Sequence, residues 1–171
     1  MDNGIKNKLS TLIGQSRVVI VCIGTDLLSG DCIGPLIGQM LIENKVPCFV
    51  YGTLNSPVTA LNVDRVNEFI KARHKGQLVV AIDSAVGGSV GRVRVYRGAL
   101  QPGSASNKVL LPIGDVAITI TTTKSLPYEE GFSLVPLGFL YLTAKKVADE
   151  LAYIIKSNPL YNENGQIASI I

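Results

Sequence analysis

Two short, uninterrupted runs of apolar residues constrain the fold of this chain more than any other feature. They are "VVIVC" within residues 17–24 and "LVVAI" within residues 77–83. Apolar runs of strand length, without polar alternation, are typical of strands that are buried on both faces of a parallel sheet. Such a sheet needs helices on both of its faces, so the two runs predict an α/β fold.

Helical and strand patterns alternate along the rest of the chain. A helix is predicted over 33–41, where apolar residues are spaced i, i+3, i+4, i+7 and i+8 and Pro35 falls in the first turn. The other expected elements are strands at 48–52, 77–83, 91–97 and 115–123, a helix from Ser56 or Asn62 to about His74, and a helix over roughly 133–156. In 91–97 arginine alternates with valine or tyrosine, which indicates an edge or hairpin strand.

We therefore predict a single three-layer α/β/α domain with a doubly wound, mostly parallel sheet. The domain is expected over residues 17–157, with an N-terminal extension at 1–16 and a C-terminal tail at 158–171. In sheets of this kind, ligands bind outside the carboxyl ends of the strands, where the strand order reverses. If the strands at 17–24 and 77–83 are neighbours, the crevice opens between their carboxyl ends.

The composition excludes several classes of protein. Of the 171 residues, 47% are hydrophobic and 17% are charged, which is typical of a globular chain and not of a disordered one. A net charge of +3 is too small to indicate a nucleic-acid partner, and the apolar runs are too short to span a membrane. The polar start shows no secretory signal, and three cysteines without a C-x-x-C pair favour a reducing cytoplasm.

Acidic side chains follow both central strands. Asp26 and Asp31 lie in the loop "GTDLLSGDCIGP", and Asp83 ends the run at 77–83. Because the carboxyl ends of neighbouring parallel strands share one edge of the sheet, we expect Asp31 and Asp83 to converge. Two carboxyl groups at one site suit general acid–base activation of water, or they bind a divalent metal. Each acid also has a local alternative: Asp31 as a helix-terminus charge, Asp83 as the start of a turn, and Asp26 in an Asx-turn.

Other polar residues are weaker candidates. Thr121 and Thr122 fall near the carboxyl end of the strand at 115–123, where they either line the crevice or only reflect β-propensity. Cys32 lies beside a helix N-terminus, a position that favours thiolates, but a cysteine nucleophile also needs a base. The single histidine, His74, is expected on the surface at the far end of a helix, so a thiol mechanism is disfavoured.

The acidic loop and the second acid carry a resemblance to a known family. "GTDLLSGDCIGP" resembles the first signature of the hydrogenase maturation endopeptidases, in which an acid of this loop binds a metal; here that acid falls on Asp31. Their second metal-binding acid falls on Asp83 in "AIDSA". The bacterial-spore germination protease is similar and keeps two aspartates at these places. Over residues 17–156 the chain is identified as a member of the YyaC family of sporulation proteins, whose proposed activity is that of a spore protease.

One departure from the resembled families limits what they imply. The hydrogenase maturation enzymes use a late histidine as a third metal ligand, and this chain has no histidine after His74. The germination protease works without that histidine, which implies a mechanism with two aspartates and no required cofactor. A divalent metal held by Asp31 and Asp83 stays the alternative.

The resemblance implies a sporulation-associated endopeptidase that uses Asp31 and Asp83. The residues expected to contact the substrate are Asp26, Thr121 and Thr122. The substrate is expected to be a protein or peptide, with small acid-soluble spore proteins as candidates, and the compartment to be the forespore or mother-cell cytoplasm. A homo-oligomer stays open. The alternative is a non-catalytic regulatory or binding module, because a fold does not fix a function.

Overall fold

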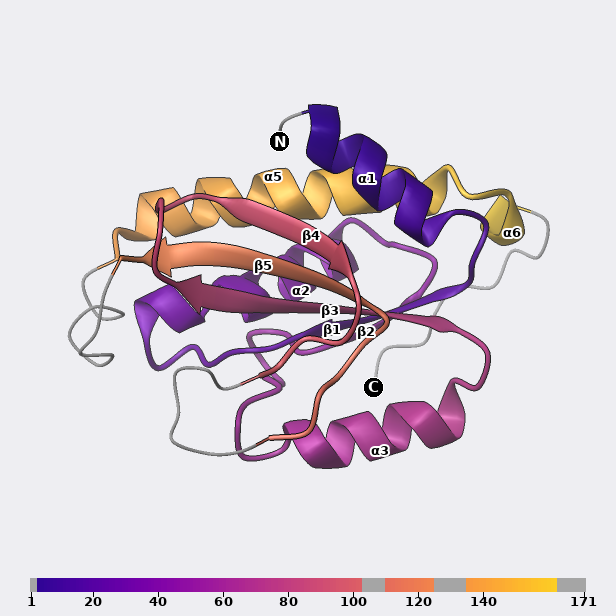
Figure 1. Ribbon diagram of the computed structural model, residues 1–171, viewed down its shortest axis with the longest axis horizontal. Coiled ribbons are helices and arrows are strands. Elements are labelled where there is room, and N and C mark those ends of the chain that lie inside the picture. The colour runs from indigo at the N-terminus through magenta and orange to yellow at the C-terminus, as the bar shows by residue number, and fades with distance from the viewer. Residues whose placement is uncertain (1–2, 103–109, 125–134, 163–171) are drawn as a thin grey trace.

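Strands and helices alternate along the chain in the computed structural model, which describes residues 3–102, 110–124 and 135–162 (Figure 1). The strands are β1 (Val18–Cys22), β2 (Phe49–Tyr51), β3 (Leu78–Val86), β4 (Val93–Arg97) and β5 (Val116–Thr123). The helices are α1 (Asn3–Ile13), α2 (Ile33–Glu43), α3 (Val63–Arg73), α5 (Leu137–Lys156) and α6 (Pro159–Asn162), with a 3₁₀ turn, η1 (Ser29–Asp31), before α2.

In the described part of the chain the strands form one five-stranded sheet, in the order β2-β1-β3-β5-β4. β4 is antiparallel to β5, and the other neighbouring strands are parallel. Because β2 lies on one side of β1 and β3 on the other, the strand order reverses between β1 and β3. The doubly wound, mostly parallel sheet is therefore confirmed, and the segment expected to be an edge strand is β4.

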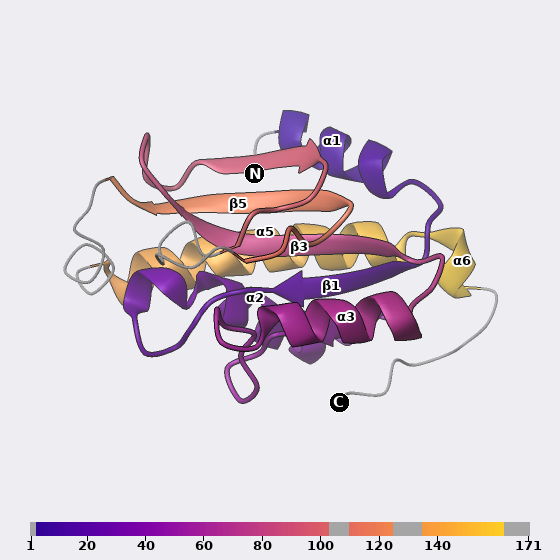
Figure 2. The same ribbon diagram turned by 60° about the horizontal axis from the view of Figure 1, so that its bottom comes forward.

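Helices cover both faces of this sheet. α1, α2 and α5 lie on one face, and α3 lies on the other (Figures 1 and 2). Side chains of β3 alternate between the two layers, so that Val80 and Ile82 belong to the core under α2 and α5 while Ala81 belongs to the core under α3. The predicted three-layer architecture is confirmed. The alternation of side chains along β3 also indicates which face of the sheet the residues after Ile82 are expected to occupy.

Three segments differ from what the sequence patterns predict. The strand expected to end at Asp83 continues to Val86, because its last residues pair with β5, so Asp83 lies inside the strand. Residues 1–16, expected as an extension, contain α1, whose Leu9 and Ile13 are fully buried in the core. The expected tail begins with α6, where the hydroxyl of Tyr161 accepts a hydrogen bond from the backbone amide of Val18 at 2.7 Å.

The apolar stripe of α5 packs against α2 and the sheet. Its buried residues include Leu140, Ala144, Val147 and Leu151. By contrast, Leu142 is 67% exposed, so one side of this helix presents apolar surface outside the main core. None of the helices in the described ranges is both long enough and apolar enough to cross a membrane.

α2 lies directly against the strands because two of its residues have no side chain. A Cβ on Gly34 would overlap with the carbonyl oxygen of Ile23, and a Cβ on Gly38 would overlap with the carbonyl oxygen of Gly52. Glycine inside a helix is less favourable than alanine by about 0.5–1 kcal/mol. The close contact between α2 and the carboxyl end of β1 therefore depends on residues that helix propensity alone would not select.

We expect Gly34→Ala to lower the free energy of unfolding by about 1–3 kcal/mol, because the added Cβ forces α2 away from Ile23. Gly138→Ala is the matched control, since an added Cβ at this position of α5 meets no heavy atom within 4 Å. The control should be neutral or more stable by up to about 1 kcal/mol. Urea unfolding followed by circular dichroism measures both variants, and an equal gain in stability for Gly34→Ala would contradict the close packing.

Candidate active site

Asp31 is held over the carboxyl end of β1 by hydrogen bonds to both of its side-chain oxygens. Oδ2 accepts a hydrogen bond from the backbone amide of Thr25 at 3.0 Å, and Oδ1 accepts one from the hydroxyl of Ser84 at 2.7 Å. The first residue of the loop, Gly24, has a φ of +143°, and a Cβ there would overlap with the Asp31 carbonyl oxygen. The carboxylate does not cap α2, whose N-cap residue is Cys32. The Asp31 side chain is thus directed at β3. A role only as a charge at the N-terminus of α2 does not explain this orientation.

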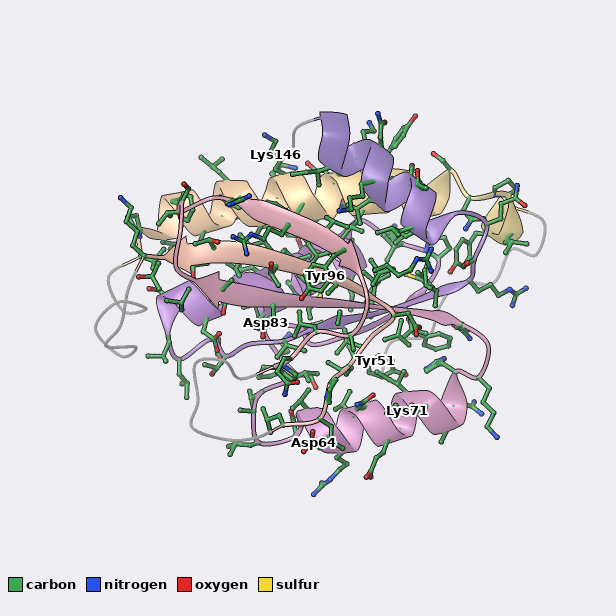
Figure 3. All side chains as sticks on the ribbon, viewed as in Figure 1. Tyr51, Asp64, Lys71, Asp83, Tyr96 and Lys146 are labelled. Carbon is green, nitrogen blue, oxygen red and sulfur yellow. The ribbon has the colours of Figure 1, made fainter. Side chains whose placement is uncertain are left out.

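Asp83 lies within β3 (Figure 3). Its carboxyl group is buried, and only 6% of the residue is exposed. Its Oδ1 accepts a hydrogen bond from the backbone amide of Ser84 at 2.8 Å. Because side chains alternate along a strand, Asp83 shares its face with Ala81 and Ser84 shares its face with Ile82. Alternation alone would place these two polar groups on opposite faces, but the Ser84 hydroxyl is near enough to the Asp83 carboxyl to lower its pKa, so both groups act at the same end of β3.

Ser84 connects the two acids, and the sequence interpretation did not include it. Its amide bonds to Asp83 and its hydroxyl bonds to Asp31, so one residue contacts both carboxyl groups. The strand β3 thus contacts η1, which carries Asp31. The signal in the sequence was a serine on the face of β3 that otherwise carries Val80 and Ile82. A buried hydroxyl on an apolar face needs a hydrogen-bond partner, and the acids of the preceding loop were available.

Burial shifts the protonation of both acids, and the charge of Asp31 adds to the shift of Asp83. Burial raises the pKa of Asp83 well above its ordinary value, and the neighbouring charge of Asp31 raises it further, whereas the amide and hydroxyl of Ser84 lower it. Burial also raises the pKa of Asp31, although the hydrogen bonds from Ser84 and Thr25 oppose that shift. The effect of the Asp31 charge on the Asp83 pKa agrees with the expected convergence of the acids, and their joint use as a site stays a prediction.

The three residues expected to contact the substrate differ in their exposure to solvent. Asp26 is exposed on the loop that leads to η1, whereas Thr121 and Thr122 are buried near the end of β5. Thr121 lies opposite Ala85 in the ladder between β3 and β5, two residues beyond Asp83. Within the described residues, the Thr122 hydroxyl has no hydrogen-bond partner. Both threonines are at the same end of the sheet as the acids, and their contact with a substrate stays a prediction.

Cys32 has the environment of a structural thiol. Its sulfur donates a hydrogen bond to the carbonyl oxygen of Ser29 at 3.0 Å. Burial raises the pKa of the Cys32 thiol, and the charges of Asp31 and Asp26 raise it further. The position at a helix N-terminus therefore does not produce a thiolate, and low reactivity of this cysteine stays our prediction.

The expectation that His74 lies on the surface is wrong. The residue is 5% exposed, and its Nε2 lies 2.7 Å from the hydroxyl of Tyr51. Its ring stacks at a tilt on Phe49, with 4.6 Å between the ring centroids. Burial lowers the pKa of His74, and the charge of Arg73 acts in the same direction. The helix-terminus argument failed because packing against the aromatic residues of β2, and not the helix dipole, determines where this ring lies.

The donor set at the acids matches a metal only in part. Two carboxyl groups and the Ser84 hydroxyl are hard oxygen donors, which suit Mg²⁺ or Ca²⁺ better than soft metals. Among residues 3–102, 110–124 and 135–162, no group of three or more histidine, cysteine, aspartate or glutamate side chains is arranged to hold an ion. Each oxygen of Asp31 accepts one hydrogen bond, which orients the carboxylate and leaves a lone pair on each oxygen for a further donor or a cation.

We expect Asp83→Asn to stabilise the protein relative to the parent chain, and the gain to grow from about pH 4 to pH 8. A carboxyl group whose pKa is raised by folding contributes stability below its unfolded pKa, and this contribution is lost as the pH rises through the folded pKa. Asparagine has no such loss. Thermal unfolding across this pH range measures the difference, with Asp26→Asn as the control because Asp26 is an exposed acid of the same region. A gain that is equal at every pH, or equal in both variants, would contradict a buried titrating carboxyl.

Known proteins match both the fold and the sequence of this chain. A [NiFe] hydrogenase maturation protease, HycI from Thermococcus kodakarensis KOD1, superposes with a TM-score of 0.62 at 22% identity, covering 88% of this chain and 99% of that one. The two proteins share the α/β fold. The protein YyaC of Bacillus subtilis (strain 168), described as uncharacterized, is 43% identical over 105 residues, which are 59% of this chain. That alignment spans 51% of YyaC, about half its length. The sequence of residues 1–147 matches a family described as "Protein of unknown function (DUF1256)", and the chain belongs to this family.

Proposed function

We propose that the protein is an endopeptidase in which Asp31 and Asp83 together activate water for the cleavage of a peptide bond. The observation that carries the proposal is the pair of carboxyl groups joined through Ser84, with Asp83 buried and its pKa raised. Two close carboxyl groups resist simultaneous ionisation, so such a pair tends to hold one proton. One acid and one base are then available at neutral pH without a histidine.

The contacts favour a different role for each aspartate. Asp31 accepts hydrogen bonds from Thr25 and Ser84, and these donors stabilise its ionised form. Asp83 is more deeply buried, which favours its protonated form. In the proposed reaction, Asp31 removes a proton from water while the water oxygen attacks the scissile carbonyl carbon. The proton of Asp83 moves to the carbonyl oxygen, which gives a neutral tetrahedral intermediate.

Collapse of that intermediate returns both groups to their starting states. Asp31 gives its proton to the departing amine nitrogen as the carbon–nitrogen bond breaks. Asp83 takes a proton back from a hydroxyl group of the intermediate, and the new carboxylic acid leaves. Each proton is thus accounted for, and the cycle needs no residue beyond the pair.

We propose that this chemistry requires no resident metal. The lack of a histidine after His74 supports this part of the proposal, because the third metal ligand of the resembled maturation enzymes has no counterpart in the chain. The shared fold with HycI, a maturation protease, supports peptide cleavage as the proposed reaction class. The resemblance of the acidic loop and Asp83 to sporulation proteins and to the germination protease suggests a sporulating cell as the setting, with small acid-soluble spore proteins as candidate substrates in the cytoplasm. The competing role is that of a non-catalytic binding module. The burial of Asp83 would be consistent with that role if substrates do not reach its carboxyl group.

We expect Asp31→Asn and Asp83→Asn each to reduce the cleavage rate by about 10²–10⁴-fold, because each removes one member of the acid–base pair. The double variant should lose little more than either single variant, since members of a catalytic unit are strongly non-additive. Asp26→Asn, which removes an exposed acid of the same loop, is the matched control and should retain most of the activity. Incubation with a small acid-soluble spore protein, after dialysis against a chelator, is followed by mass spectrometry of the products.

Two results would each contradict a different part of this proposal. Full cleavage by Asp83→Asn would remove the paired mechanism and favour the binding module. Activity that disappears on dialysis and returns with a divalent ion would overturn the metal-independent mechanism and favour ligation by the same two acids.

A further inference from the structure

A groove with a volume of about 570 Å³ lies between α1, the start of β4 and the first half of α5. Its apolar lining consists of Ile5, Val93, Phe139, Leu142 and Val147. The volume is within the range of pockets that hold small ligands or a few side chains of a peptide, roughly 300–1,000 Å³. Leu142 contributes an apolar side chain that is 67% exposed, so the groove offers a contact that the fold itself does not use.

The charged residues of the groove are both basic. Arg92 and Lys146 are its two charged lining residues, and Figure 3 labels Lys146 on α5. Neither cation forms an ion pair within the described ranges, although two nearby lysines do. Lys6 lies 3.3 Å from Glu150 and Lys145 lies 2.8 Å from Asp149. Asp149 and Glu150 of α5 are thus paired with other lysines in the part of the chain that the structure describes, and an occupant with carboxylates would complement the charges of Arg92 and Lys146.

The groove is connected to the end of the sheet that carries the two aspartates. The backbone amide of Gly91 donates to the carbonyl oxygen of Thr121 at 2.8 Å, and the amide of Thr121 donates to the carbonyl oxygen of Arg92 at 2.9 Å. Thr121 lies opposite Ala85, two residues beyond Asp83 in β3. One chain of backbone contacts thus joins the basic rim of the groove to the strand that holds the buried acid.

We propose that this groove docks a segment of the peptide substrate that combines acidic and apolar side chains. The apolar side chains would pack on Leu142 and Phe139, and the carboxylates would face Arg92 and Lys146. Docking at a distance from the scissile bond would hold the rest of the peptide near Asp31 and Asp83. This inference rests on the proposed peptidase function, and it adds the substrate class that the acids alone do not specify.

Binding can be measured separately from cleavage. The probe is a capped six-residue peptide of alternating glutamate and leucine in which one leucine is replaced by tryptophan. Because the chain contains no tryptophan, the peptide fluorescence reports binding without background from the protein. The titration uses the full chain carrying Asp83→Asn, so that the probe stays intact.

We expect Arg92→Glu and Lys146→Glu, each added to this chain, to weaken binding by about threefold to tenfold. Lys71→Glu is the control of equal charge change, since Lys71 is exposed on α3 (Figure 3). Leu142→Gln should weaken binding by a similar factor, and Leu61→Gln, an exposed leucine outside the groove, should not. A peptide with lysine in place of glutamate should fail to bind.

Several results would overturn the docking site. An equal loss in Lys71→Glu would indicate only a net-charge effect, and an unchanged affinity in Leu142→Gln would remove the apolar contact. Preferential binding to phosphatidylglycerol vesicles would assign the groove to an anionic lipid instead. In the cleaving chain, Arg92→Glu should raise KM for an acidic peptide and leave kcat near its starting value. Groove-dependent binding without any cleavage by the parent chain would keep the docking site and contradict the peptidase proposal.

Discussion

The contact between α2 and the carboxyl end of β1 positions everything else at the candidate site. Glycines at both sides of this contact leave no room for a side chain: Gly24 lies against the Asp31 carbonyl, and Gly34 lies against the Ile23 carbonyl. The loop that contains both Gly24 and Asp31 is thereby folded back over the end of the strand. Asp31 then reaches across to Ser84 of β3 instead of facing solvent at the start of α2.

The chemistry of the pair follows from how a parallel sheet is buried. β3 lies between β1 and β5 and is covered by helices on both faces, so Asp83 is removed from water by the layers themselves. A carboxyl group in such a position retains its proton more strongly, and a second acid nearby strengthens that tendency. The raised pKa implies a lower stability near neutral pH, and perturbed carboxyl groups of this kind are frequent at functional sites. Ser84 moderates this effect because it contacts both acids.

The sequence predicts the centre of this molecule better than its edges. The buried runs in β1 and β3 indicate two neighbouring parallel strands, and this neighbourhood places Asp31 within reach of Ser84, the residue after Asp83. The length of β3 beyond Asp83 was missed because Ser84 and the residues after it have no apolar pattern, and only pairing with β5 makes them a strand. α1 was missed because its buried Leu9 and Ile13 lie in a polar segment. The burial of His74 depends on aromatic residues of a distant strand, which no local pattern reveals.

Titration of the two aspartate side chains by ¹³C NMR tests the central claim most directly, because it observes the coupled carboxyl groups themselves. The account predicts that Asp83 in the parent chain takes up its proton well above the ordinary pKa of an aspartate, about 3.9. In Asp31→Asn this titration should move to lower pH, because the neighbouring charge is gone. An Asp83 carboxyl that titrates at its ordinary pKa, or that is unaffected by Asp31→Asn, would contradict the account.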